Sequence, residues 1–253
     1  YTNFADETHI HYDGALESAL SLKTIIINPM QQGELSKIPL FSIADYTWNM
    51  DRFDNMKSWK ASLRAVLGGE KWENFETIVP YLRYYDSLSP LAGLINEFKV
   101  SYADNAATTS GKALKEELIK IINSCTVIEQ MSQSECKSDS LFYADLRPWL
   151  LKLKSMATNA VTMIEALTAK DLSEIDIVKF AKSWSAIEGI EKNEDHRFDI
   201  LRGMGTDITL SVQTAEHAAQ SLRPFLDWLL DTFSNNKHQT NEHKTDTLRA
   251  TSN

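Results

Sequence analysis

Glycine and cysteine are both scarce in this chain of 253 residues, which has nine glycines and two cysteines. So few glycines favour helices joined by short turns over a β-sandwich with its many tight turns. Two cysteines cannot build a disulfide framework, and Cys125 and Cys136 lack the spacing of a metal site. Cys125 lies on the apolar face of a predicted helix, where a free cysteine packs as a small hydrophobic residue. A Cys125–Cys136 disulfide is the alternative.

Positive charge and long apolar runs are also lacking. The 26 Lys and Arg residues are outnumbered by 35 Asp and Glu residues, which gives a formal net charge of -9. This balance, without a basic stripe interleaved with aromatics, predicts no nucleic-acid partner. No apolar run approaches the roughly 20 residues that a membrane-spanning helix needs. No signal peptide is recognised, but the chain starts at Tyr1 without methionine, so we expect it to be part of a longer protein.

Common catalytic and metal-binding motifs are missing as well. There is no Gly-x-Ser-x-Gly elbow and no His-Glu-x-x-His, and neither His196 nor His217 has the Glu three residues earlier that a di-metal bundle requires. Gly203-Met-Gly205 lacks the Lys-Ser/Thr of a phosphate loop. The run His9-Ile-His11-Tyr-Asp13 offers three ligand types without a fourth, so solvated surface is favoured over a metal site. We therefore predict no metal and no cofactor.

Helical periodicity is what the sequence does contain. Residues 35–48 are apolar almost all round, which indicates a buried helix capped by Ser36 with Pro39 in its first turn. After a polar loop over Gln130–Asp139, the longest element carries a bundle seam and has Pro148 near its start. Its seam residues alternate steps of three and four: Leu146, Leu150, Leu153, Ala157, Ala160, Ile164 and Leu167.

Two further helices and a charged turn are predicted near the end of the chain. One helix presents Ile177, Val178, Ala181, Trp184 and Ile187, and a charged turn follows over Glu191–Asp199. The last helix carries an apolar stripe, and the chain beyond Ser234 is polar and reads as a flexible tail. The residues of the last stripe are Ala215, Ala218, Leu222, Phe225, Leu226, Leu229 and Phe233.

The most informative stretch runs from Ile25 to Trp59. Ile25-Ile-Ile-Asn28-Pro29 has the β-branched residues of a buried strand, ended by a residue that proline pushes out of the helical region. Ser36-Lys-Ile38 follows, then Ala44-Asp-Tyr-Thr-Trp-Asn49, and then Ser58-Trp59. In this order the three runs resemble glycoside hydrolase family 84, the β-N-acetylglucosaminidases that include O-GlcNAcases and bacterial enzymes labelled hyaluronidase. A weaker resemblance to the same family is found at Leu201–Thr206 and Pro224–Trp228.

The resemblance places the chain at the junction between the end of a catalytic (β/α)8 barrel and the helical domain behind it. It implies an all-α, multi-helix bundle after a short barrel remnant. The expected boundaries are 1–33 for the end of the barrel, 34–233 for the post-catalytic bundle and 234–253 for the polar tail. It also implies contact between the bundle and the barrel, and an extracellular or cell-surface location.

Asn28 is the one site residue that the resemblance carries over, because the family's Asn-Pro asparagine contacts hydroxyls of the bound sugar. Its amide can donate and accept together, although an asparagine before proline can also simply cap a turn. Family 84 is understood to use two neighbouring aspartates in substrate-assisted hydrolysis, and this sequence has no Asp-Asp pair. We therefore predict no catalytic residue here and no hydrolysis by this chain alone.

Other polar and aromatic residues of the stretch are assigned structural roles. Asp45 is interpreted as a hydrogen-bond acceptor inside a helix, and Trp48 and Trp59 as core residues. Tyr84 and Tyr85 could line a groove, but their surroundings depart from the family pattern. The predicted role is to support the barrel and shape the groove of an enzyme that acts on N-acetylglucosamine-containing glycans or glycoproteins. The alternative is a stand-alone helical module that binds a protein partner.

Overall fold

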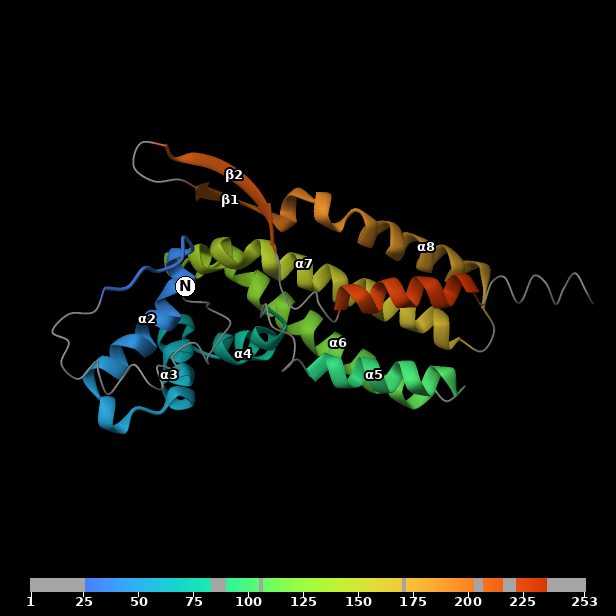
Figure 1. The fold of residues 1–253 in the computed structure, drawn as a ribbon, viewed down its shortest axis with the longest axis horizontal. Helices are drawn as coiled ribbons and strands as arrows, with labels where there is room; N and C mark the ends of the chain where they lie inside the picture. Colours follow the sequence, from blue (N-terminus) through green and yellow to red (C-terminus); the bar gives the residue numbers. More distant parts are fainter. Residues whose placement is uncertain are drawn as a thin grey trace, which may run out of the picture. The chain divides into compact units, whose positions relative to one another are not determined.

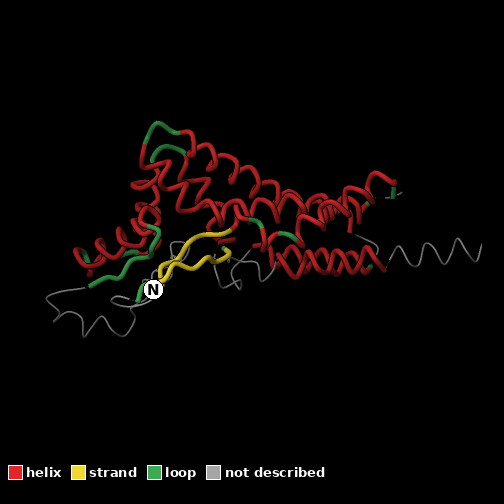
Figure 2. Tube along the Cα trace, turned by 90° about the horizontal axis from the view of Figure 1, so that it is seen from above, coloured by secondary structure: helices red, strands yellow, loops and turns green. Residues whose placement is uncertain are grey.

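The computed structural model describes residues 26–82, 90–104, 107–169, 172–202, 207–215 and 222–235. Within these residues helices dominate, and the only sheet is a two-stranded hairpin, as Figures 1 and 2 show. The predicted all-α class and multi-helix bundle are confirmed. The helices are α2 (Gly33–Trp48), α3 (Asn55–Leu67), α4 (Lys71–Leu82), α5 (Pro90–Ala103), α6 (Ala107–Glu129), α7 (Lys137–Thr168), α8 (Glu174–Glu188) and a last helix over 222–235.

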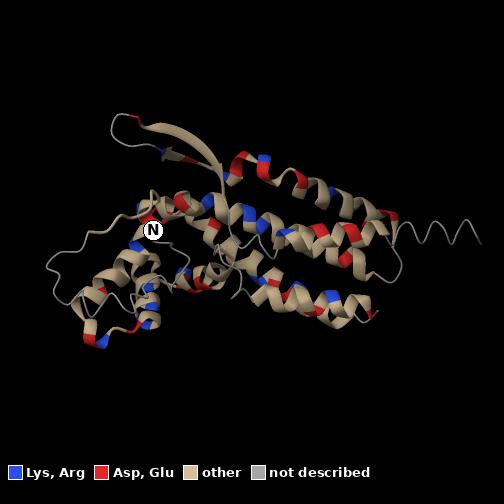
Figure 3. Cartoon of the chain, viewed as in Figure 1, with Lys and Arg blue, Asp and Glu red and all other residues tan. Residues whose placement is uncertain are grey.

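The chain divides into two compact units, and α6 and α7 each contribute to both. The described residues of unit 1 come from 26–82, 123–153, 194–202 and 207–215. Those of unit 2 come from 90–104, 107–122, 154–169, 172–193 and 222–235. Figure 3 shows basic and acidic residues interspersed along the helices of both units, in keeping with solvated outer faces.

Helix α2 opens unit 1 and is capped from a distant part of the chain. Asp145 of α7 accepts hydrogen bonds from the backbone N–H groups of Glu34, at 2.7 Å, and Leu35, at 3.4 Å. The predicted cap at Ser36 is wrong, because its hydroxyl lies inside the helix and donates to the Gln32 carbonyl at 2.8 Å. Pro39 consequently lies in the body of α2 and not in its first turn. The predicted burial of α2 is largely correct, with Leu35, Ile38, Ile43 and Tyr46 in the core.

Helix α3 begins directly after Asp54 and ends directly before Gly68. Asp54 caps it by accepting from the Lys57 N–H at 3.0 Å, and the chain leaves the helix at Gly68 and Gly69, which have φ of 64° and 49°. Only glycine adopts such angles without strain, so the helix ends there. Trp59 is buried as predicted.

Trp48, by contrast, is 90% exposed at the last residue of α2, so its assignment to the core is wrong. A periodic pattern places a residue on a face of a helix, but it does not show how far the neighbouring elements extend over the helix end. Ile26 is 93% exposed, and residues 26–32 form no strand. The predicted buried strand end is therefore absent from this part of the chain, where no described strand pairs with its backbone.

The long helix α7 confirms the predicted seam, since every seam residue except the half-buried Leu167 is buried. Its start was predicted wrongly, because α7 begins at Lys137 and contains Pro148 in its interior. The missing N–H of a proline removes one hydrogen bond, and the buried neighbours Leu146 and Leu150 hold the helix on both sides. The predicted loop before it is a short 3-10 helix, η2 (Gln130–Gln133), and a brief connection.

Two strands that were not predicted lie near the end of the described chain, and the first begins within the predicted charged turn over Glu191–Asp199. Strand β1 (Arg197–Arg202) pairs antiparallel with β2 (Thr209–Thr214), with Asp199 opposite Val212 and Leu201 opposite Leu210. Alternation places Phe198 and Ile200 on one face of the hairpin. Leu201, Leu210 and Val212 share the opposite face and are exposed. Each strand is only six residues long, which is too short to stand out against a helical background.

Unit 2 is built around an aromatic cluster. Phe98 of α5 makes edge-on contacts with Phe225 and Trp228 of the last helix, both at 6.0 Å between ring centroids. Gly111 lets α6 approach this cluster, since a Cβ there would lie 3.0 Å from the Phe98 ring. The residues of the last stripe from Leu222 to Phe233 are buried in the last helix as predicted. Ala215 was wrongly assigned to this helix, because it directly follows β2, and Ala218 lies outside the described residues.

Helix α8 begins at a capping box formed by Ser173 and Asp176. Its buried face carries Phe180, Ser183 and Ile187, with Phe180 stacked on Phe233 at 3.8 Å between centroids. The predicted stripe is therefore partly wrong, because Val178 and Ala181 are exposed. The described helices include none that is both long and apolar enough to cross a bilayer. Cys125 is buried, Cys136 is exposed, and neither forms a disulfide bond, so the disulfide alternative is excluded.

Candidate functional site

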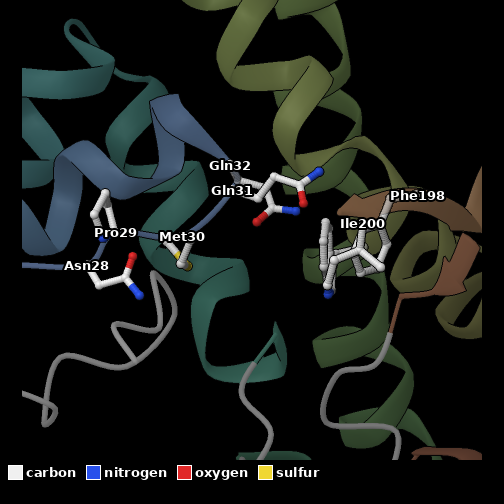
Figure 4. A pocket seen from close by; sticks show the side chains of 8 residues that line it. Asn28, Pro29, Met30, Gln31, Gln32, Phe198 and Ile200 are labelled. Atoms are coloured by element: carbon white, nitrogen blue, oxygen red, sulfur yellow. The ribbon is translucent and has the colours of Figure 1, made fainter. Parts of the chain in front are cut away.

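A pocket of about 280 Å³ lies in unit 1 where the extended segment before α2 meets α7 and the hairpin (Figure 4). The predicted site residue Asn28 is exposed at its rim. In Figure 4, Asn28 lies across the pocket from Phe198 and Ile200. The lining residues come from three separate parts of the sequence: Asn28, Pro29, Met30, Gln31, Gln32, Trp149, Phe198 and Ile200.

Gln31 attaches the extended segment to the hairpin. Its Nε2 donates to the Asp199 carbonyl at 2.8 Å, and its Oε1 accepts from the Leu201 N–H at 3.1 Å. The side-chain amide thus makes the two hydrogen bonds that a neighbouring strand would make with the outer edge of β1. This pairing holds β1 beside the segment that carries Asn28.

Aromatic rings form one wall of the pocket. Trp149 of α7 packs on Phe198 of β1 with 4.5 Å between ring centroids and 33° between the ring planes. Both rings are half-buried, so each keeps surface available to a ligand. Aromatic rings in this arrangement give a rigid apolar surface.

The base of the hairpin is fixed to α7 by polar contacts. Arg147 pairs with Asp195, and the buried Lys152 donates from Nζ to the Ala215 carbonyl at 2.9 Å. The Ala215 N–H in turn donates to the carbonyl of His196, a second buried residue, at 2.8 Å. These contacts position Phe198 against Trp149, since β1 starts directly after His196.

Two carboxyl groups of unit 1 have shifted pKa values. Burial raises the pKa of Asp145, against the opposing effect of the hydrogen bonds from Glu34 and Leu35. Burial acts in the same direction on Asp139, but the hydrogen bonds from Lys71 and Ser134 outweigh it and hold the Asp139 pKa below its ordinary value. Asp145 caps α2, whereas Asp139 accepts from the side chains of Lys71 and Ser134, and neither lines the pocket.

The chemistry available in the pocket is binding by stacking and by neutral hydrogen bonds. None of its eight lining residues carries a charge or titrates near neutral pH. The described part of the chain also contains no group of three or more His, Cys, Asp or Glu side chains that could hold a metal ion.

The other residues singled out in the sequence lie elsewhere or are not described. Asp45 is half-exposed on α2, and His196 is buried directly before β1. The His9–Asp13 run, Tyr84, Tyr85, His217 and Gly203–Gly205 all lie outside the described residues. Sequence reasoning missed Gln31, Trp149, Phe198 and Ile200 as pocket residues, because only the tertiary fold brings these distant segments together.

Comparison with known proteins agrees with this fold. A family model described as β-N-acetylglucosaminidase matches residues 10–79, a range that contains all three runs of the informative stretch. Solved structures named for glycoside hydrolase family 84 also match. This chain is related to glycoside hydrolase family 84.

Three family 84 structures illustrate the likeness. CpGH84D has a TM-score of 0.62 and 23% identity, over 80% of this chain and 33% of its own. A mutant O-GlcNAc hydrolase from Thermobaculum terrenum has a TM-score of 0.64 and 17% sequence identity, over 85% of this chain and 42% of its own. CpGH84B has a TM-score of 0.56 and 20% sequence identity, over 81% of this chain and 33% of its own. The chain thus spans about one-third to two-fifths of these solved chains.

Proposed function

We propose that this chain is the C-terminal, post-catalytic helical region of a family 84 β-N-acetylglucosaminidase. The observation that carries the proposal is the family match over residues 10–79, because it includes Asn28, which lines the pocket. The helical bundle supports the catalytic barrel and helps to shape the substrate groove. The substrates of the whole enzyme are N-acetylglucosamine-containing glycans or glycoproteins.

The proposed division follows the expected boundaries. Residues 1–33 complete the barrel, 34–233 form the post-catalytic bundle, and 234–253 form a polar tail. The start of α2 at Gly33 supports the first boundary. The exposed apolar side chain of Trp48 in the bundle is suited to contact with the barrel. An extracellular or cell-surface location belongs to the same proposal, and fractionation of the producing cells tests it.

The chain itself is proposed to be catalytically inactive. Substrate-assisted hydrolysis needs one carboxyl group to orient the acetamido group and another to protonate the leaving oxygen, and the sequence has no adjacent aspartates. The uncharged lining of the pocket supports the same view. In this assignment Asn28 hydrogen-bonds hydroxyls of the sugar and takes no part in proton transfer.

The test compares this chain with the full-length protein from the same gene on a chromogenic N-acetylglucosaminide. We expect the full-length protein to release product and the folded chain to release none above the blank. Product release by twice-purified chain would contradict the inactive assignment. An inactive, well-folded full-length protein would contradict the proposal as a whole.

A stand-alone interaction module is the second candidate function. It is favoured by the exposed apolar residues Leu172, Ile175 and Val178 at and just before the start of α8, a type of surface that mediates protein contacts. The coding sequence upstream of Tyr1 discriminates between the two candidates. A barrel domain with adjacent aspartates supports the hydrolase, and a different type of domain supports the module.

A further inference from the structure

The two edges of the β1–β2 hairpin differ. The outer edge of β1 is occupied, because the Gln31 side chain bonds the Asp199 carbonyl and the Leu201 N–H. The backbone groups of Asp199 and Leu201 therefore point away from β2. Their opposite residues in the register, Val212 and Leu210, must then point their own N–H and C=O groups away from β1. These groups form the second edge of the sheet.

The second edge has no strand beside it in the described part of the chain, where the sheet contains only β1 and β2. It also lacks charges, proline and bulges, the features that keep an exposed edge from pairing with another chain. The sequence of β2, Thr-Leu-Ser-Val-Gln-Thr, is uncharged, and its register with β1 is unbroken. Leu210 and Val212 are 63% and 50% exposed. Such an edge is a template for another strand.

A second copy of β2 matches this template. Antiparallel pairing about a two-fold axis requires outward-pointing residues to lie opposite each other. An axis at Ser211 places Leu210 opposite Val212 of the second copy, whereas an axis at Val212 places Leu210 opposite Thr214. The axis at Ser211 is favoured, because it pairs apolar side chains across the strands. Since β2 is uncharged, neither register brings like charges together.

We infer that β2 pairs antiparallel with β2 of a second copy of this protein, about a two-fold axis at Ser211. The two hairpins then form one four-stranded sheet. Leu210 and Val212 of each copy exchange backbone hydrogen bonds with Val212 and Leu210 of the other. Two short strands bury less than the roughly 800 Å² per partner of a standard interface, so the dimer should dissociate reversibly. This pairing does not depend on the proposed function.

The first test locates the axis in the full-length protein by cross-linking. Ser211→Cys places a thiol opposite its own copy in a non-hydrogen-bonded pair, where Cα atoms lie about 4.5 Å apart and a disulfide can form. Gln213→Cys is the matched control, because it is also half-buried and lies on the same face of β2 but away from the axis. After mild oxidation we expect a disulfide-linked dimer from Ser211→Cys alone. The parent protein reports any cross-linking through the exposed Cys136.

The second test measures the dimer Kd of the full-length protein by analytical ultracentrifugation. Val212→Lys puts an ammonium on the pairing edge, and each dimer contains two such positions, so the Kd should rise about tenfold or more. Leu201→Lys is the matched control, because it adds the same charge to the same exposed face on β1, away from the pairing edge. It should leave the Kd within about twofold of the parent value. The melting temperature of each variant reports its folding.

We expect the parent protein to dimerise with a Kd below about 0.1 mM. A protein that stays monomeric at that concentration overturns the proposed pairing. A dimer whose Kd is unchanged in Val212→Lys does so as well, because its interface then lies elsewhere. Pairing about Ser211 is overturned if Ser211→Cys cross-links no better than Gln213→Cys. Slow hydrogen exchange of the Leu210 N–H in a monomer would show that another segment of the same protein covers the edge.

Discussion

The carboxylate of Asp145 accepts the backbone N–H of Glu34 at 2.7 Å, so a residue of α7 caps a helix that begins 111 residues earlier in the chain. Asp145→Ala should lower the free energy of unfolding by about 1 kcal/mol, the usual effect of losing a cap. Asp145→Asn should lower it less, because an amide oxygen still accepts and burial disfavours the carboxylate charge. Urea unfolding measures both variants. Equal stability of Asp145→Ala and the parent would show that water replaces the cap.

The contact between Asp139 and Lys71 should make the stability of the fold depend on pH in the acid range. The pKa of Asp139 is lower in the folded chain than its ordinary value, so the unfolded state binds the proton more readily. The contribution of Asp139 to the free energy of unfolding is therefore fully present above the pKa that this carboxyl has in the unfolded chain. It is lost as the pH falls through the lower pKa of the folded chain. Asp139→Asn should flatten the loss of stability below about pH 4. Thermal melts from pH 2 to 6 measure the slopes, and parallel curves would contradict the assignment.

The seam of α7 should account for a large share of the stability. Leu153 and Ile164 are buried, and truncating either to Ala removes methyl groups and leaves a cavity, at a cost of about 2–5 kcal/mol. Leu141→Ala on the same helix is the control, because its side chain is exposed and the loss should stay within about 0.5 kcal/mol. Denaturant unfolding compares the three. A parent-like midpoint for both core variants would mean that the seam faces solvent.

The sequence predicts those features that depend on neighbouring residues. The seam of α7 and the stripe of the last helix follow from a three-four spacing, and the end of α3 follows from its glycines. The cap of α2, the tolerance of α7 for Pro148 and the exposure of Trp48 depend on residues far away in the sequence. No local signal contains that information.

The candidate site shows the same limit. Asn28 could be selected from a motif of its family, whereas Trp149 and Phe198 reach the pocket only through tertiary packing. Within a mostly helical sequence, Phe198 and Ile200 are two apolar residues in a charged region. Their alternation becomes meaningful once β2 pairs with β1.

Asn28 should contribute to substrate binding in the full-length enzyme. Asn28→Ala removes an amide that can donate to and accept from sugar hydroxyls, so kcat/KM for an aryl N-acetylglucosaminide should fall about tenfold or more. Asn123→Ala, at an exposed position of α6, is the control and should leave kcat/KM unchanged. If both variants match the parent, Asn28 serves only as a turn residue before Pro29.

Gln31 should control the local stability of β1. The Leu201 N–H donates to the side chain of Gln31 at 3.1 Å, so its protection from hydrogen exchange depends on that amide. Gln31→Met keeps the length of the side chain but removes both the acceptor for Leu201 and the donor to Asp199.

Exchange at the Leu201 amide, resolved by NMR, should therefore become about tenfold faster in Gln31→Met, as expected from the loss of one net hydrogen bond. Gln32→Met is the matched control, because the neighbouring side chain makes no bond to β1 among the described contacts. It should leave the Leu201 rate unchanged. Unchanged exchange in Gln31→Met, with the hairpin still paired to β2, would show that the fold of α7 and the base contacts of Lys152 hold β1 in place without Gln31.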